Sequence, residues 1–179
     1  MSRLILFSGG VESTALLVQA KPGDVLLTIL PTYPNDWATF RKNSSEGIAK
    51  HHGFDVRYAR IDIPIEPLPY TFVHQMRSFV SVANLWVAKD KTITEVWCGR
   101  NNKEPGEVLA PFIEQMMTAW TVLHPEVPFL HPLDHLSKRQ QWDMIPAAIR
   151  PLVSSCIHHR FCGVCYKCKE WLCLSESSL

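Results

Sequence analysis

Short apolar runs rich in β-branched residues alternate along this chain of 179 residues with longer segments whose apolar positions recur at helical spacing. The short runs predict strands at residues 3–7, 24–30, 55–61, 94–98 and 128–131. The helical patterns cover residues 13–19, 37–52, 70–89 and 108–123, and Gly53 is placed to end the second of these helices. This alternation predicts an α/β fold with a doubly wound, mainly parallel five-stranded sheet.

The composition is that of a globular protein, with 46% hydrophobic and 20% charged residues. We expect one main domain over residues 1–150 and a small C-terminal segment over residues 151–179. The formal net charge of +1 predicts neither a direct nucleic-acid partner nor binding to an anionic membrane. Because the apolar run before Ser8 is too short for a signal peptide, and no later run reaches transmembrane length, we expect a cytoplasmic location.

The stretch LILFSGGVEST, residues 4–14, leads from a predicted strand through two glycines into a predicted helix. Main-chain N–H groups and the helix dipole favour an anion at such a turn, and serine and threonine hydroxyls add donors. The spacing matches neither the Walker loop nor the dinucleotide-binding loop. We therefore predict a different phosphate-binding loop, and the alternative is a capped turn that binds nothing. The residues of this loop are Ser8, Gly9, Gly10, Val11, Glu12, Ser13 and Thr14.

Five of the six cysteines lie in the last 24 residues. Four of them follow one another at spacings that suit a closed tetrahedral zinc site, in which zinc has a structural role. They are Cys156, Cys162, Cys165 and Cys168. In a reducing compartment clustered thiols bind metal more often than they form disulfides, although a disulfide pair or a redox-active Cys-x-x-Cys is the alternative. We expect Cys173 to be packed on a following helix.

Taken together, the two ends of the chain resemble the 7-cyano-7-deazaguanine synthases, a family of the PP-loop ATP pyrophosphatase superfamily. That family joins a Ser-Gly-Gly-x-Asp-Ser-Thr loop to a C-terminal zinc site that reads Ser-Cys, a spacer, then Cys-Gly-x-Cys-x-x-Cys. The matching residues here are 8–14 and 155–168. Weaker similarity covers residues 79–83, 99–104, 111–114 and 132–138.

The resemblance implies a structural Zn²⁺, ATP and Mg²⁺, with 7-carboxy-7-deazaguanine and ammonia as substrates. The carboxylate would be adenylated with release of pyrophosphate, ammonia would displace AMP to give the amide, and a second adenylation would lead to the nitrile. The family's known enzymes are often dimers, so a homodimer is the expected assembly.

The resemblance also assigns roles to single residues. Ser13, Glu12 and Lys138 are the catalytic candidates: a loop serine, a Mg²⁺ ligand for which Glu104 is an alternative, and a charge that neutralises phosphate. The alternative for Lys138 is an ordinary first-turn lysine of a helix capped by Ser137. Three further residues are expected near the adenine and ribose, because nucleotides bind at the carboxyl ends of parallel strands. These are Leu30, Pro31 and Gly99.

The sequence departs from the family at three points. Glu12 stands where the family has Asp, the family's Pro-Asp-Cys-Arg segment is missing between Glu104 and Pro111, and Gln75 replaces an arginine. These changes leave two other functions open: transfer of the adenylated acid to another amine, which includes an amine on a protein, and a catalytically silent nucleotide-binding scaffold. A sulfur transferase is disfavoured, because its cysteine would have to come from the zinc set or be Cys98.

Overall fold

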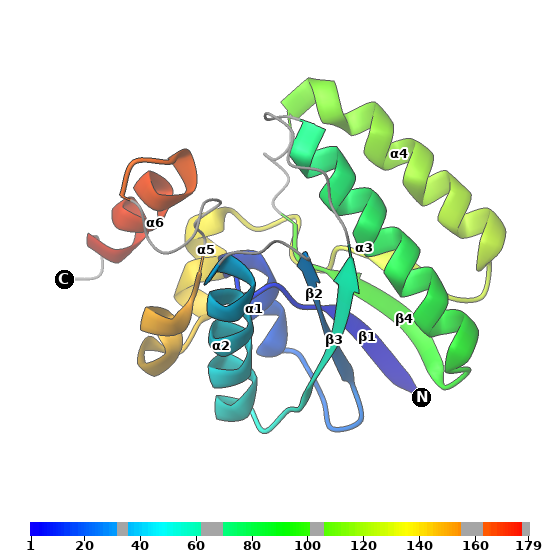
Figure 1. Cartoon of the computed structure of the whole chain (residues 1–179), viewed down its shortest axis with the longest axis horizontal. Helices are drawn as coiled ribbons and strands as arrows, with labels where there is room; N and C mark the ends of the chain where they lie inside the picture. The colour runs from blue at the N-terminus through cyan, green and yellow to red at the C-terminus, as the bar shows by residue number, and fades with distance from the viewer. Residues whose placement is uncertain (32–35, 62–69, 101–105, 155–162, 177–179) are drawn as a thin grey trace.

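The computed structural model describes residues 1–31, 36–61, 70–100, 106–154 and 163–176. Its centre is a five-stranded sheet in the order β3-β2-β1-β4-β5, in which every neighbouring pair is parallel (Figure 1). The strands are β1 (Ser2–Leu6), β2 (Val25–Pro31), β3 (Val56–Ile61), β4 (Ile93–Cys98) and β5 (Phe129–Leu130). Each lies within two residues of the range that the hydrophobic pattern predicts.

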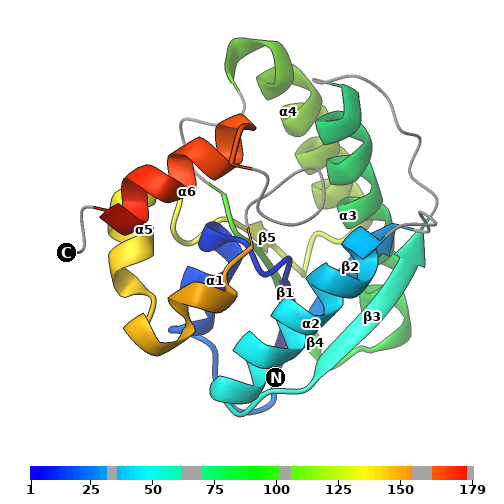
Figure 2. The ribbon, with the colours of Figure 1, turned by 60° about the vertical axis from the view of Figure 1, so that its left-hand side comes forward.

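Helices pack on both faces of this sheet, as a doubly wound fold requires (Figure 2). Helices α1, α2 and α5 pack on one face, and α3 and α4 on the other. The helices are α1 (Val11–Leu17), α2 (Asp36–His51), α3 (Tyr70–Lys89), α4 (Gly106–Leu123), α5 (Lys138–Met144) and α6 (Tyr166–Glu176), with a 3₁₀ helix, η1 (Ala147–Leu152). Gly53, just after α2, has a φ of +75°, so it ends that helix in the left-handed conformation that the sequence predicts for it.

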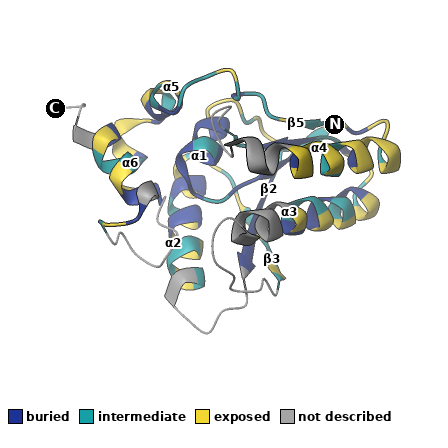
Figure 3. Cartoon of the chain, turned by 90° about the horizontal axis from the view of Figure 1, so that it is seen from above, coloured by how far each residue is buried: buried dark blue, intermediate teal, exposed yellow. Residues whose placement is uncertain are grey.

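The central strand β1 divides its side chains between two cores. Ile5 and Phe7 belong to the core beneath α1, α2 and α5, whereas Leu4 and Leu6 belong to the core beneath α3 and α4. This division follows from the two-residue period of a strand, which turns successive side chains to opposite faces. Helix α1 is so deeply enclosed that all its residues except Glu12 are buried (Figure 3). The loop before α1 is therefore anchored on a rigid base.

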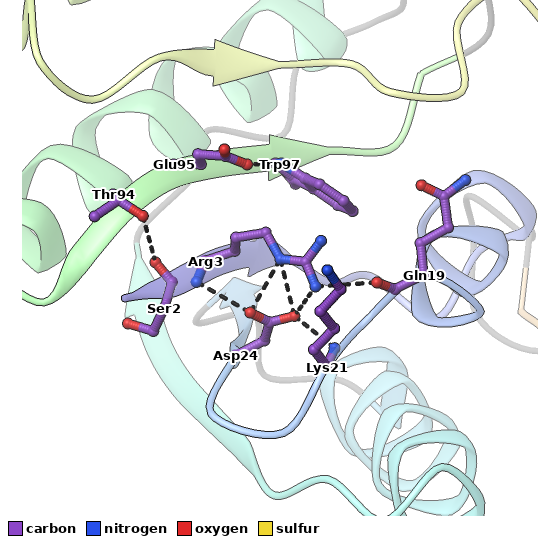
Figure 4. Close-up of polar contacts among 8 residues, drawn as sticks. All are labelled: Ser2, Arg3, Gln19, Lys21, Asp24, Thr94, Glu95 and Trp97. Atoms are coloured by element: carbon purple, nitrogen blue, oxygen red, sulfur yellow. Dashed lines mark hydrogen bonds and ion pairs between the residues drawn. The ribbon is translucent and has the colours of Figure 1, made fainter.

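The other end of β1 is tied to the turn before β2 by Arg3 (Figure 4). The Nε of Arg3 donates to both carboxylate oxygens of Asp24 at 3.0 Å, and its Nη2 donates to the Gln19 carbonyl at 3.0 Å. The guanidinium also lies 4.0 Å from the centre of the Trp97 ring, a cation–π distance. Burial alone would raise the pKa of Asp24, but the hydrogen bonds from Arg3 and the Lys21 N–H outweigh it and hold this pKa below its usual value.

The C-terminal helix α6 packs on α5. The rings of Trp142 and Trp171 meet edge to face with their centres 6.1 Å apart, and Arg139 Nη1 donates to the Leu174 carbonyl at 3.1 Å. Leu174 is buried in the same core as α1 and α2. The division of the chain near residue 150 stays a prediction. Among the described residues, no helix combines the length and apolar character needed to cross a membrane.

Candidate functional site

The glycine loop leaves β1 at the carboxyl edge of the sheet and enters α1. Gly9 has a φ of +75°, and a Cβ at this position would lie 3.2 Å from Ser44 Oγ and 3.4 Å from Ser45 Oγ. Both the backbone conformation and the packing of α2 therefore require glycine here. Behind the loop, the main-chain N–H of Ser154 donates to the Gly9 carbonyl at 2.8 Å, while Ser44 donates its hydroxyl to the Leu152 carbonyl.

Hydroxyl groups hold the loop together from inside. Ser13 Oγ donates to the Gly10 carbonyl at 3.2 Å, accepts from the Ser8 N–H at 3.2 Å, and lies 3.0 Å from Ser8 Oγ. The Gly10 N–H donates to Ser8 Oγ at 3.3 Å. Ser13 is only 3% exposed. Its hydroxyl thus fixes the shape of the loop.

The first turn of α1 begins at this loop without a side-chain cap. Gly10 is the N-cap residue, and it makes no side-chain cap hydrogen bond to the first-turn N–H groups. Such N–H groups have no acceptor within their own helix, and they carry the positive end of its dipole. The side chains of Val11 and Thr14 are fully buried. The serines support the shape of the predicted phosphate-binding loop, and the binding of an anion by its main-chain groups stays a prediction.

Gly99, directly after β4, lies against the peptide bond between Glu12 and Ser13. A Cβ on Gly99 would lie 2.6 Å from the carbonyl carbon of Glu12 and 2.6 Å from the nitrogen of Ser13. The glycine lets β4 and α1 approach this closely. Leu30, which the sequence also places near the nucleotide, is 4% exposed at the end of β2. Contacts of both residues with adenine or ribose stay predictions.

Lys138 brings a positive charge from α5 to this loop. Its side chain is 7% exposed, and its Nζ lies 2.8 Å from Glu12 Oε1 and 2.5 Å from Glu170 Oε2. Ser137 caps α5 in a capping box with Gln140. Lys138 is thus both the first residue of a capped helix and a positive charge beside the loop. The two interpretations, a first-turn lysine and a charge that neutralises phosphate, are therefore compatible.

The contact with Lys138 gives Glu12 a role in the fold. A buried ammonium is costly unless carboxylates compensate its charge. Glu12 supplies one such carboxylate from α1, and an aspartate would end one methylene short of it. Glu170 supplies another carboxylate, from α6. No local pattern in the sequence marks Glu170 or Ser154, because each reaches the loop through a tertiary contact only.

Two of the four predicted zinc ligands are described. Cys165 and Cys168 are 8% and 0% exposed and form a small cluster, in which the Cys168 N–H donates to Cys165 Sγ at 3.4 Å. Gly163 just before them has a φ of +73°. An N–H bond to sulfur stabilises a thiolate, so this turn suits a metal. Cys156 and Cys162 lie outside the described residues, and the described residues alone contain no group of three potential ligands.

At the carboxyl end of β4, Cys98 and His131 contact each other. His131 Nδ1 lies 3.0 Å from the Cys98 carbonyl, and since a carbonyl only accepts, Nδ1 carries the proton. Burial lowers the pKa of His131. Burial, aided by the charge of Glu12, raises the pKa of the Cys98 thiol to about 12. Cys98 is therefore a poor nucleophile at neutral pH.

No protein-family model matches the chain, and no curated protein matches its sequence. Solved structures share its fold, and two of them are tRNA- or RNA-modifying proteins by their descriptions. The U34-tRNA thiolase NcsA from Methanococcus maripaludis, solved with its [4Fe-4S] cluster, is 13% identical at a TM-score of 0.57, over 99% of this chain and 65% of that one. A 4-thiouridine synthetase in complex with RNA and bound ATP is 16% identical at a TM-score of 0.57, over 99% of this chain and 53% of that one.

The chain has the α/β fold of these two structures. This confirms the fold class that the sequence predicts. The chain spans between about half and two thirds of the length of these two structures. At such low identity the likeness establishes the fold alone.

Proposed function

We propose that this protein is an ATP-dependent enzyme of the PP-loop superfamily, which adenylates the carboxylate of 7-carboxy-7-deazaguanine. With ammonia it forms the amide and then the nitrile, 7-cyano-7-deazaguanine, releasing AMP and pyrophosphate. The observation that carries the proposal is the buried Lys138, held 2.8 Å from Glu12 at the first turn of α1. A positive charge beside an uncapped helix start suits the phosphates of ATP. The ATP bound to the 4-thiouridine synthetase supports nucleotide binding by this fold.

In this proposal the residues of the loop and Lys138 have different roles. Adenylation builds up negative charge on phosphate oxygens, and the first-turn N–H groups of α1 and the Lys138 ammonium offset it without rearranging. Ser8 and Ser13 hold the loop so that its N–H groups are oriented before ATP arrives. Glu12, at the edge of α1, would hold Mg²⁺, which neutralises phosphate charge when bound. Glu104, the other Mg²⁺ candidate, lies outside the described residues.

We further propose that Cys156, Cys162, Cys165 and Cys168 hold a structural Zn²⁺. The buried thiols of the two described cysteines, and the N–H bond to one of them, fit a metal-bound turn. The related thiolase is described with a [4Fe-4S] cluster, which cysteine thiolates also bind. Metal analysis of protein purified without oxygen tells the two apart: one zinc per chain supports the proposal, and four irons with acid-labile sulfide contradict it.

The direct test is an assay of zinc-loaded protein with Mg·ATP, 7-carboxy-7-deazaguanine and ammonia. We expect AMP release that requires the acid, and a product with the mass of the nitrile. Ser13→Ala removes the hydroxyl that closes the loop and should lower AMP release. The control is Glu126→Gln, which removes an exposed carboxylate in the turn before β5. Equal AMP release with and without the acid would contradict the proposal.

The product distinguishes the remaining alternatives. An amide as the final product, or an adduct with a protein amine, would favour transfer of the acid to an acceptor other than ammonia. The missing family segment before Pro111 is the reason for considering this alternative. ATP binding without AMP release for any acid would favour the silent scaffold. Our proposal keeps a small-molecule acid and ammonia as partners, with a homodimer as the assembly, and involves no direct contact with nucleic acid or membrane.

A second candidate function is ATP-dependent sulfur insertion into RNA, which the fold likeness to a thiolase and a thiouridine synthetase favours. The raised pKa of Cys98 makes this thiol unsuitable as the sulfur carrier. AMP release that depends on tRNA and a sulfide donor, instead of on the acid, would establish this function in place of the first.

A further inference from the structure

Glu170 lies on α6, far along the chain from the loop, yet it contacts the lysine at the loop. Its Oε2 lies 2.5 Å from Lys138 Nζ, which lies 2.8 Å from Glu12 Oε1. The side chain of Glu170 is 34% exposed, whereas that of Lys138 is 7% exposed. Glu170 therefore approaches the buried ammonium from the solvent side, and Glu12 approaches it from the loop.

The helix that carries Glu170 is fixed in place. The ring contact between Trp142 and Trp171 and the bond from Arg139 to the Leu174 carbonyl hold α6 against α5, which carries Lys138. Both helices pack on the core that supports α1. A carboxylate on such a support restrains the position of the ammonium, because the backbone that carries it is itself held in place.

We infer that Glu170 is a positioning residue, which holds the Lys138 ammonium in place at the loop while Glu12 engages Mg·ATP. The inference rests on the proposed function. When Glu12 turns toward a cation, its ion pair with Lys138 weakens. Glu170 retains one charge-assisted hydrogen bond to the ammonium, so the lysine stays directed at the phosphates.

The direction in which the affinity for Mg·ATP changes distinguishes a positioning role of Glu170 from a purely electrostatic one. Replacing Glu170 with glutamine removes a negative charge near the anionic phosphates, so Coulomb repulsion alone predicts tighter ATP binding. Positioning predicts the opposite, because the ammonium loses a strong hydrogen bond. We expect Mg·ATP to bind about tenfold more weakly to Glu170→Gln. Glu170→Asp keeps the charge but draws it back from Lys138, so its binding should also weaken.

The experiment measures the dissociation constant of Mg·ATP by titration calorimetry, using the full-length, metal-loaded chain. Two variants are the controls. Lys169→Gln removes a charge from an exposed neighbour of Glu170 on α6, and Glu126→Gln removes an exposed carboxylate in the turn before β5. Metal content and the thermal unfolding midpoint show whether α6 stays docked in each variant. A double-mutant cycle with Lys138→Met tests whether Glu170 acts through the lysine, in which case Glu170→Gln has no further effect in that background.

The outcomes separate this inference from the proposed function. Weaker binding in both Glu170 variants, unchanged controls and a non-additive cycle support the positioning role. Unchanged or tighter binding in Glu170→Gln, or full additivity with Lys138→Met, overturns it while leaving the proposed function in place. If Glu170→Gln fails to fold, Glu170→Asp decides by the same criterion. A wild-type chain that does not bind Mg·ATP overturns both.

Discussion

The close approach of β4 to α1 at Gly99 makes a sharp steric prediction. In Gly99→Ala the new Cβ would lie 2.6 Å from Glu12 C and Ser13 N and 2.8 Å from Glu12 O. Ordinary van der Waals contact begins near 3.4 Å, so α1 and β4 must separate by close to an ångström. The three atoms belong to backbone, so no side-chain rotation can relieve the clash. Gly99 does not have a positive φ, and the cost is therefore steric.

Inserting one methyl group into a well-packed core costs about 1–3 kcal/mol. Because the new Cβ of Gly99→Ala would meet backbone atoms of α1, we expect a cost near the upper end of this range. We expect its free energy of unfolding to fall by about 3 kcal/mol. Because the displaced atoms belong to the first turn of α1, Mg·ATP binding should weaken as well. Displacements of about 1 Å can cost on the order of a hundredfold in activity, so AMP release should fall further.

The assay is urea unfolding followed by tryptophan fluorescence, together with calorimetric titration of Mg·ATP. Gly47→Ala is the matched control. Gly47 lies inside helix α2, and its new Cβ would lie 3.2 Å from Leu152 Cδ1, the end of a flexible side chain. Alanine is the better helix former by about 0.5–1 kcal/mol, so this control should leave stability unchanged or slightly raised. A loss below about 0.5 kcal/mol in Gly99→Ala, within the usual range for surface substitutions, would refute the packing argument.

Three further predictions concern charged groups. Glu12→Asp draws the carboxylate back by about 1.5 Å from Lys138, so the free energy of unfolding should fall by about 1–2 kcal/mol in urea titrations. Arg3→Ala removes the guanidinium from a carboxylate whose side chain is 5% exposed and should cost about 2 kcal/mol, measured in the same way. Burial lowers the pKa of His131, so the unfolded chain binds this proton more readily and stability should fall as the pH drops below about 6.5. His131→Gln should reduce that loss, measured as the urea midpoint from pH 7.5 to 5.5.

Each of these predictions has its own counter-result. Equal stability of Glu12→Asp and wild type would show that the ion pair with Lys138 contributes nothing. For Arg3, a double-mutant cycle with Asp24→Asn isolates the pair, and additive losses would contradict a direct interaction. For His131, an unchanged pH slope in the glutamine variant would assign the acid sensitivity to other groups.

The sequence alone predicts most of the sheet and the long helices, because each of these elements repeats its hydrophobic period several times. It predicts short elements less well. Helix α5 and the 3₁₀ helix Ala147–Leu152 are each two turns or less, and only Ser137, as a cap, marks the start of the first. Proline does not prevent this 3₁₀ helix, although Pro151 lies within it.

The sequence by itself determined the strand, the two glycines and the start of α1, because these segments are consecutive and each has its own local pattern. Phosphate binding at this loop stays a prediction. The family resemblance named Lys138 and Glu12 as candidates, without showing that they meet. Only the tertiary structure decided that contact, and it added Glu170 and Ser154 from the C-terminal part of the chain. The physical reason is that side chains from α1, α5 and α6 converge through core packing, and such convergence leaves no period or spacing in the sequence.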